Sequence, residues 1–166
     1  MTELLVIRHA IAFDRDPSRW RDDTQRPLSP QGIRKARKAA AGLKRLTRPP
    51  NHLLTSPLLR ARQTAMLLTD CAGWPGAQAA PELAPGVEPR VVLDLLGQYR
   101  TGRIALVGHQ PGLSQLLTAC LAGEVDTFDI EMKKNAVACL SFRGAPRAGR
   151  ATLNWLATPR LLRSVR

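Results

Sequence analysis

The sequence predicts an α/β fold, a three-layer sandwich in which helices flank a mainly parallel β-sheet. Short apolar runs alternate with longer segments of helical periodicity, the pattern of strands joined by crossover helices. The 166 residues are close to the usual size of one domain, and 44% of them are hydrophobic, enough for a core without disulfides or a structural metal. We therefore expect a single domain over residues 1–166.

The first predicted strand covers residues 3–8, an apolar run close to the N-terminus. The polar, proline-containing segment 15–32 follows it and fits neither the helical nor the strand period, so we interpret it as an active-site loop. Ser29 and Pro30 have the residue types of an N-cap and a first helical residue. The helix that they begin is expected to end before Pro49.

The middle of the chain contains a second strand, a helix and an irregular connection. "HLLTSP" at 52–57 is the predicted strand, and Ser56 is expected to be the N-cap of the helix that follows. Residues 72–87 are rich in Gly, Pro and Ala and are interpreted as a connection. A further helix is expected around residues 90–98.

The last third contains the third buried strand, "RIALVGH" at 103–109. Pro111 is expected to open a helix after it, because apolar residues then recur at helical spacing. Two later β-like runs, 136–142 and 151–157, are interpreted as a terminal hairpin.

The formal net charge of +12 indicates an attraction to anions without defining a function. Much of it lies in residues 33–48 and in an Arg-rich tail at 143–166, which we interpret as a solvated helix face and a basic tail. Only 4% of the residues are aromatic, so stacking platforms for bases are scarce and nucleic-acid binding is disfavoured.

Three cysteines are an odd number for a disulfide framework, and their spacing does not suit zinc: Cys71, Cys120 and Cys139. We expect them to be reduced and buried. The N-terminus lacks the pattern of a signal peptide, and no apolar run reaches membrane-spanning length, so a cytoplasmic location is expected. No heptad seam is present, and a monomer is the expected state.

Two of the three histidines stand at the ends of predicted strands. Arg8 and His9 end the first strand, and His109 ends the third. Arg60 is expected in the first turn of the helix after the second strand. Since ligands of parallel α/β sheets bind beyond the carboxyl ends of the strands, these four groups are expected to converge. His52 begins its strand, at the wrong end, and is interpreted as structural.

Three motifs in this order resemble the histidine phosphatase superfamily, also called phosphoglycerate mutase-like: "IRHA" at 7–10, "TSPLLRARQTA" at 55–65 and "VGHQPGL" at 107–113. "RPLSPQG" at 26–32 and the short chain are similar to the SixA-type phosphohistidine phosphatases within it. The resemblance spans about residues 3–122 and the final hairpin. It implies a phosphoglycerate mutase-like fold and a single histidine phosphatase domain.

The resemblance also implies a set of roles. His9 would be the nucleophile that forms a phosphohistidine intermediate, and His109 a second imidazole that donates a hydrogen bond to the phosphoryl group. Arg8 and Arg60 would bind the phosphate with planar forks of donors. No cofactor or metal is implied. Ala10 stands where the family usually has glycine, and a local adjustment is expected there.

The leaving group determines whether a general acid is needed. Imidazole leaving from phosphohistidine has a conjugate acid of pKa about 6.5 and needs little help, whereas an alkoxide needs an acid. Glu82 in "PELAP" lies in the connection where broader family members carry their acid, and a surface role is its alternative. Asp14, Asp16, Asp22 and Asp23 of the first loop are further alternatives.

Three functions remain open from the sequence. The first is a metal-independent phosphatase acting on phosphohistidine in a protein, such as a phosphorelay domain. The second keeps the chemistry but acts on a small phosphoester, a sugar phosphate or a nucleotide. The third is a basic polyanion-binding module that kept the fold without catalysis, and the complete set of Arg8, His9, Arg60 and His109 argues against it.

Overall fold

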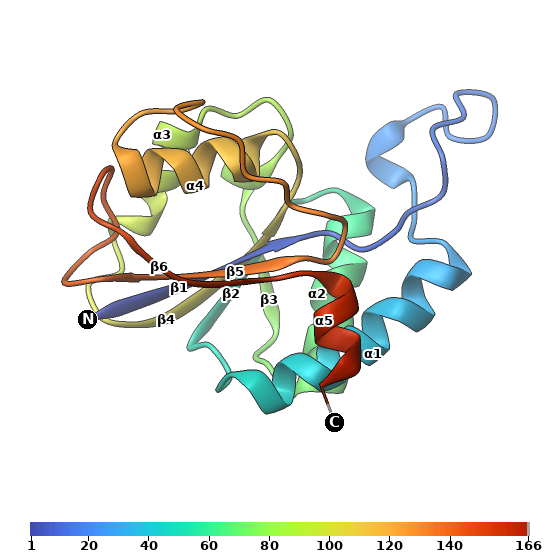
Figure 1. The fold of residues 1–166 in the computed structure, drawn as a ribbon. Helices are drawn as coiled ribbons and strands as arrows, with labels where there is room; N and C mark the ends of the chain where they lie inside the picture. The colour runs from blue at the N-terminus through green and yellow to red at the C-terminus, as the bar shows by residue number, and fades with distance from the viewer. Residues whose placement is uncertain (166) are drawn as a thin grey trace.

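The computed structural model describes residues 1–165, which form a six-stranded sheet between two layers of helices (Figure 1). The strand order is β3-β2-β4-β1-β5-β6. The strands are β1 (Thr2–Arg8), β2 (His52–Thr55), β3 (Ala77–Ala79), β4 (Gly102–Gly108), β5 (Val137–Phe142) and β6 (Thr152–Ala157). Strands β1 to β4 are parallel, and β5 pairs antiparallel with both β1 and β6. The predicted α/β sandwich with a mainly parallel sheet is confirmed.

Helices cover both faces of the sheet (Figure 1). One layer consists of α1 (Pro30–Leu46), α2 (Leu59–Ala72) and α5 (Pro159–Ser164), and the other of α3 (Pro89–Leu96) and α4 (Gly112–Ala122). Two short 3₁₀ helices, η1 (Asp23–Gln25) and η2 (Pro81–Leu83), lie in the connections.

The central strand β1 explains why its sequence is a continuous apolar run. Leu4 and Val6 belong to the core beneath α3 and α4, whereas Leu5 and Ile7 belong to the core shared with α1, α2 and α5. Successive side chains of a strand point to opposite faces, so a strand covered on both sides needs apolar residues at every position. Its charged end, Arg8, is the first residue to leave this core.

The predicted cap of α1 is confirmed, and the predicted cap of α2 is wrong. The Ser29 hydroxyl accepts a hydrogen bond from the Gly32 N–H at 3.0 Å, with Pro30 in the first turn. Helix α2, by contrast, begins at Leu59 with Leu58 as its N-cap. Ser56 instead extends the sheet, since its N–H donates to a β4 carbonyl at 2.9 Å, and its hydroxyl is available to the site described below.

One strand and one α-helix were not predicted from the sequence. Strand β3 lies within the 72–87 connection and contains only Ala and Gln, residues without strand preference, so its pairing with β2 defines it. Helix α5 lies in the segment 143–166 interpreted as a basic tail, and its Leu162 is buried. A Cβ on Gly42 of α1 would stand 1.8 Å from the Leu162 carbonyl oxygen, so glycine permits this close packing.

The thiols and the surface cations lie largely as expected. Cys120 and Cys139 are buried, whereas Cys71 is half-buried, and all three are free. The cations of α1 are mostly exposed, which agrees with a solvated helix face. Within residues 1–165, none of the helices has the length and apolar character needed to cross a lipid bilayer.

Candidate active site

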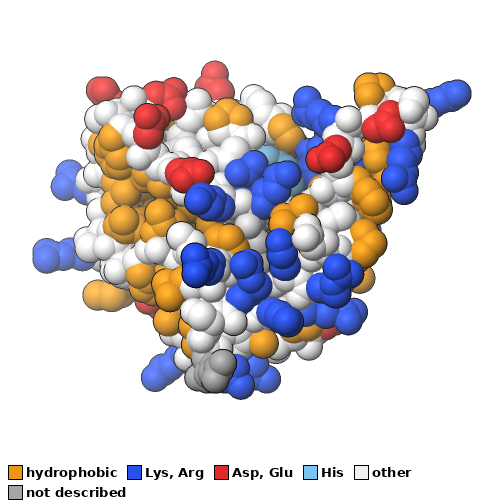
Figure 2. Space-filling view, turned by 45° about the vertical axis from the view of Figure 1, so that its right-hand side comes forward, with side chains coloured by type: hydrophobic (Ala, Val, Ile, Leu, Met, Phe, Trp, Pro, Cys, Tyr) orange, Lys and Arg blue, Asp and Glu red, His pale blue; other side chains and the backbone are white. Residues whose placement is uncertain are grey.

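The four groups predicted to converge lie together at the carboxyl end of the sheet. Arg8 is the last residue of β1, and the His9 N–H donates to the Gly108 carbonyl at the end of β4 (3.1 Å). The rings of His9 and His109 are 5.0 Å apart between centroids. Figure 2 shows a histidine between basic side chains, in the recess beside the projecting loop.

The orientation of the His9 ring is set by a backbone carbonyl. Its Nδ1 lies 2.7 Å from the Ala10 carbonyl oxygen, which can only accept, so Nδ1 carries the proton and Nε2 keeps its lone pair. The Ala10 N–H donates to Thr64 Oγ1 (3.0 Å), and this hydroxyl donates to the Arg60 carbonyl (2.7 Å). These bonds connect the nucleophile candidate to the helix that carries Arg60.

Ala10, the departure from the family pattern, packs and forms hydrogen bonds within the turn after β1. It is buried, and its methyl group packs in a small apolar cluster that includes Ala12 and Leu28. Both backbone groups of Ala10 form hydrogen bonds, and the expected local adjustment stays a prediction.

Both histidines are held neutral. Desolvation, opposed by the hydrogen bond to Ala10 and assisted by the nearby His109, Arg60 and Arg8, lowers the pKa of His9 from 6.5 to about 3. Desolvation, together with Arg60 and Arg8, lowers the pKa of His109 to about 4. An imidazole must be neutral to attack phosphorus, so the environment keeps His9 in the reactive form at physiological pH.

This shift predicts a pH-dependent stability. Between pH 6.5 and the folded-state pKa values of about 3 and 4, the unfolded chain binds protons that the folded protein does not. Above pH 6.5 the two histidines leave the free energy of unfolding unchanged. As the pH falls from 6.5 towards their folded-state pKa values of about 4 and 3, they lower it. We expect the urea midpoint to fall from about pH 7.5 to pH 5, where most carboxylates are still ionised. A His9→Asn/His109→Asn double variant should show a smaller fall, and an equal fall in both proteins would contradict the prediction.

Arg8 is anchored by a segment that sequence reasoning did not single out. Its Nη1 donates to the carbonyl of the buried Met132 at 2.7 Å. The Asn135 N–H donates to the carbonyls of both Arg8 and His9, each at 3.1 Å, and Asn135 has φ +69°. Asparagine tolerates this left-handed conformation better than most residues, but the residue type alone does not indicate which chain segment it contacts.

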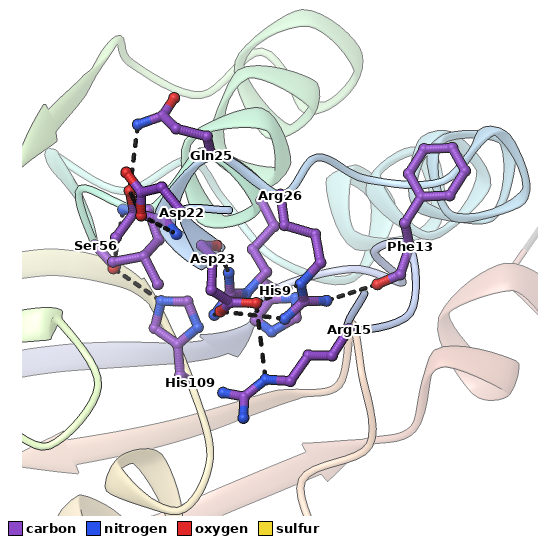
Figure 3. Close-up of polar contacts among 12 residues, drawn as sticks. His9, Phe13, Arg15, Asp22, Asp23, Gln25, Arg26, Ser56 and His109 are labelled. Atoms are coloured by element: carbon purple, nitrogen blue, oxygen red, sulfur yellow. Dashed lines mark hydrogen bonds and ion pairs between the residues drawn. The ribbon is translucent and has the colours of Figure 1, made fainter. Parts of the chain in front are cut away.

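His109 has one partnered and one free ring nitrogen. Its Nε2 lies 2.8 Å from Ser56 Oγ (Figure 3), and its buried Nδ1 has no hydrogen-bond partner among the described residues. Ser56 is thus a further residue of the candidate site that sequence reasoning missed, because the serine-proline pair resembled a helix cap. The Nδ1 of His109 is a hydrogen-bonding group that no protein atom among residues 1–165 uses.

Glu82 shares a small cavity with His109. The two residues line one small cavity of about 20 Å³, together with apolar side chains that include Leu83 and Leu116. Within residues 1–165, the Glu82 carboxylate makes neither a hydrogen bond nor an ion pair. Its position is compatible with an acid near the leaving group, and that role remains a prediction.

The first loop contributes an ion-pair cluster that sequence reasoning did not predict. Asp23 Oδ2 lies 3.2 Å from Arg60 Nη2, and Arg60 Nη1 donates to the Asp23 carbonyl at 2.9 Å. Arg26, itself buried, donates from Nε to Asp23 Oδ1 at 2.7 Å, and Arg15 Nε lies 3.7 Å from that oxygen (Figure 3). Arg26 belongs to the "RPLSPQG" segment, which was a signal that could have found it.

The loop carboxylates differ from one another in their surroundings. A hydrogen bond from Arg26, and then the charges of Arg60, Arg26 and Arg15, lower the pKa of Asp23, so it stays ionised and is a poor general acid. Asp16 and Asp22 are exposed and accept hydrogen bonds from Ser18 and Thr24, two residues further along. These two carboxylates stabilise local turns.

Known proteins resemble this chain in sequence and in fold. A family model for the histidine phosphatase superfamily (branch 1) matches residues 4–84. An uncharacterized protein of Picosynechococcus sp. is 36% identical over 125 residues, 74% of each chain. The phosphohistidine phosphatase SixA of Escherichia coli is 28% identical over 141 residues, 82% of this chain and 84% of SixA. The structure of the protein histidine phosphatase SixA complexed with tungstate has a TM-score of 0.82 and 26% identity, covering 95% of this chain and 97% of that one.

The matched region includes the Arg8-His9 pair and Arg60, and the relatives extend the match beyond it. The third function open from the sequence, a binding module without catalysis, is not supported, because the family model and the similar SixA proteins all point to a phosphatase. The family and the similarity to SixA expected from the motifs are confirmed. The chain belongs to the histidine phosphatase superfamily and is a phosphatase.

Proposed function

We propose that this phosphatase removes phosphate from phosphohistidine in a protein, without a metal, through a covalent intermediate at His9. The observation that carries the proposal is the neutral His9 imidazole, its Nδ1 bound to Ala10, beside two arginines and His109. A guanidinium pair around a desolvated imidazole suits a phosphoryl group, whose transfer depends mainly on positioning and on neutralising oxygen charge.

The reaction would run in two displacements. The Nε2 lone pair of His9 attacks phosphorus, the bond from phosphorus to the substrate nitrogen breaks, and the departing imidazole takes up a proton. Water then attacks phosphorus, the bond from phosphorus to His9 Nε2 breaks, a proton is lost to solvent, and neutral His9 and phosphate remain. Arg8 and Arg60 would stabilise the equatorial oxygens, and His109 Nδ1, which lacks a partner among the described residues, would donate to one of them.

The relatives support the substrate class. The protein from Escherichia coli is named a phosphohistidine phosphatase, and the related structure binds tungstate, an oxyanion of phosphate-like charge and shape. We propose the cytoplasm as the location, since the three free thiols suit a reducing compartment. A phosphorelay protein is the kind of partner that would carry the phosphohistidine.

The test is a comparison of rates on two substrate classes. Turnover of a phosphohistidine protein, prepared with phosphoramidate, is measured beside a panel of sugar phosphates and nucleotides, with and without chelator. We expect much higher kcat/KM on the phosphoprotein and no effect of the chelator. Good activity on a phosphoester and negligible activity on phosphohistidine would reject the proposal.

Glu82 favours a specific alternative, a small phosphoester as substrate, because Glu82 and His109 line the same cavity. If it is the acid, Glu82→Gln should slow hydrolysis of an alkyl phosphoester by roughly two to four orders of magnitude. Hydrolysis of phosphohistidine should fall only modestly, since imidazole leaves without much help. A modest and equal loss on both substrates would make Glu82 structural. Asp94→Asn, on the neighbouring helix α3, is a control for charge.

A further inference from the structure

The candidate phosphate site, formed by Arg8, His9, Arg60 and His109, already contains a carboxylate. Asp23 pairs with the guanidinium of Arg60 there. Both terminal nitrogens of Arg60 contact Asp23, one through the side chain and one through the carbonyl oxygen. The Arg60 side chain is only 4% exposed, so few of its donors can face solvent instead. The remaining Arg60 donor, Nε, is buried without a partner among the described residues.

A phosphoryl group bound by Arg60 would compete with this carboxylate. Both are negatively charged hydrogen-bond acceptors that bind the same Nη donors. Two anions in a partly buried site also repel each other. The phosphoryl group can also contact Arg8, His9 and His109, which Asp23 does not touch. A doubly charged ligand with these added contacts can therefore displace the carboxylate, whereas a singly charged ligand gains little.

We propose that Asp23 is a specificity-determining residue, an internal carboxylate that an incoming anion must displace from Arg60. The inference rests on the proposed function, because it takes this site to bind a phosphoryl group. It adds a selection by charge, in which phosphoryl groups enter and carboxylate ligands are rejected.

The surroundings of Asp23 allow this displacement. Its side chain is 39% exposed, and η1, which it begins, is only three residues long. The other cations on its carboxylate, Arg26 and Arg15, belong to the same loop and can keep their contacts when it leaves Arg60. Arg26 is also tied to the Phe13 carbonyl at 2.6 Å, which keeps the base of the loop in place.

The test measures binding of inorganic phosphate by calorimetry in wild type, Asp23→Asn and Asp22→Asn. The Asp22 variant is a matched control, because it removes the same charge one residue away, where the carboxylate only caps Thr24. We expect Asp23→Asn to bind phosphate about tenfold more tightly, the gain of roughly one charge-assisted hydrogen bond that no longer has to be broken. Asp22→Asn should change the affinity by less than about threefold. Acetate should compete with phosphate more effectively in Asp23→Asn than in wild type.

Other outcomes separate the inference from the proposed function. Weaker phosphate binding by Asp23→Asn would show that Asp23 positions Arg60 for its ligand, and equal tightening in both variants would show a general charge effect. Either result overturns the inference, and so does acetate competition equal to that of wild type. Binding of phosphate by wild type would still support the proposed phosphate site. Failure of wild type to bind phosphate overturns both. Thermal unfolding of each variant checks that the fold is unchanged.

Discussion

Replacing His9 with alanine should reduce turnover to background, a loss of about four to six orders of magnitude, as when other covalent nucleophiles are removed. The physical reason is that the structure offers no second nucleophile in the same position. The His109 ring is 5.0 Å away and has one nitrogen committed to Ser56. Steady-state rates on the phosphohistidine protein measure the loss.

The matched control for this variant is His52→Ala, which removes the exposed histidine at the opposite end of the sheet. It should retain near wild-type turnover, and both variants should unfold cooperatively. Rapid acid quench of wild type during turnover should trap phosphate on His9. Phosphate trapped reproducibly on another residue, or substantial activity in His9→Ala, would contradict the assignment.

Replacing Arg60 with alanine should lower kcat/KM by about three orders of magnitude, within the range seen for cationic groups that stabilise phosphoryl transfer. Arg60 is buried at the first turn of α2, so its charge acts through a poorly screened environment. Arg60→Lys keeps the charge but loses the planar fork, and should recover only part of the loss. Kinetics on the phosphoprotein, with phosphate inhibition measured in parallel, give both values.

Arg62→Ala is the control for Arg60, because it removes an exposed cation from the same helix turn. Its effect on kcat/KM should be less than about threefold, as for a screened surface charge. Full recovery of activity in Arg60→Lys would mean that charge alone matters at this position. Loss of equal size in the Arg60 and Arg62 variants would argue against a specific phosphate contact.

Local chemistry was enough to predict the fold class and the positions of four candidate site residues. The apolar runs that became β1 and β4 had to be central strands, since only strands covered on both faces require apolar residues at every position. Parallel neighbours bring their carboxyl ends to one edge, so Arg8-His9 and His109 could be placed together before any coordinates. The helix cap at Ser29 was equally local, because its partner is three residues away.

The remaining features depend on contacts between distant segments, and nothing in the local residue types encodes them. Strand β3 exists through its pairing with β2, and α5 through its packing against Gly42. Ser56 resembled a cap, but its hydroxyl lies against His109, 53 residues further along the chain. Asp23 was one of four similar carboxylates in the first loop, and only the folding of that loop against α2 sets it apart. The role of a loop side chain depends on which partner the fold brings within a few ångströms. Asp23 therefore forms an ion pair with Arg60, whereas Asp22 accepts a hydrogen bond within its own turn.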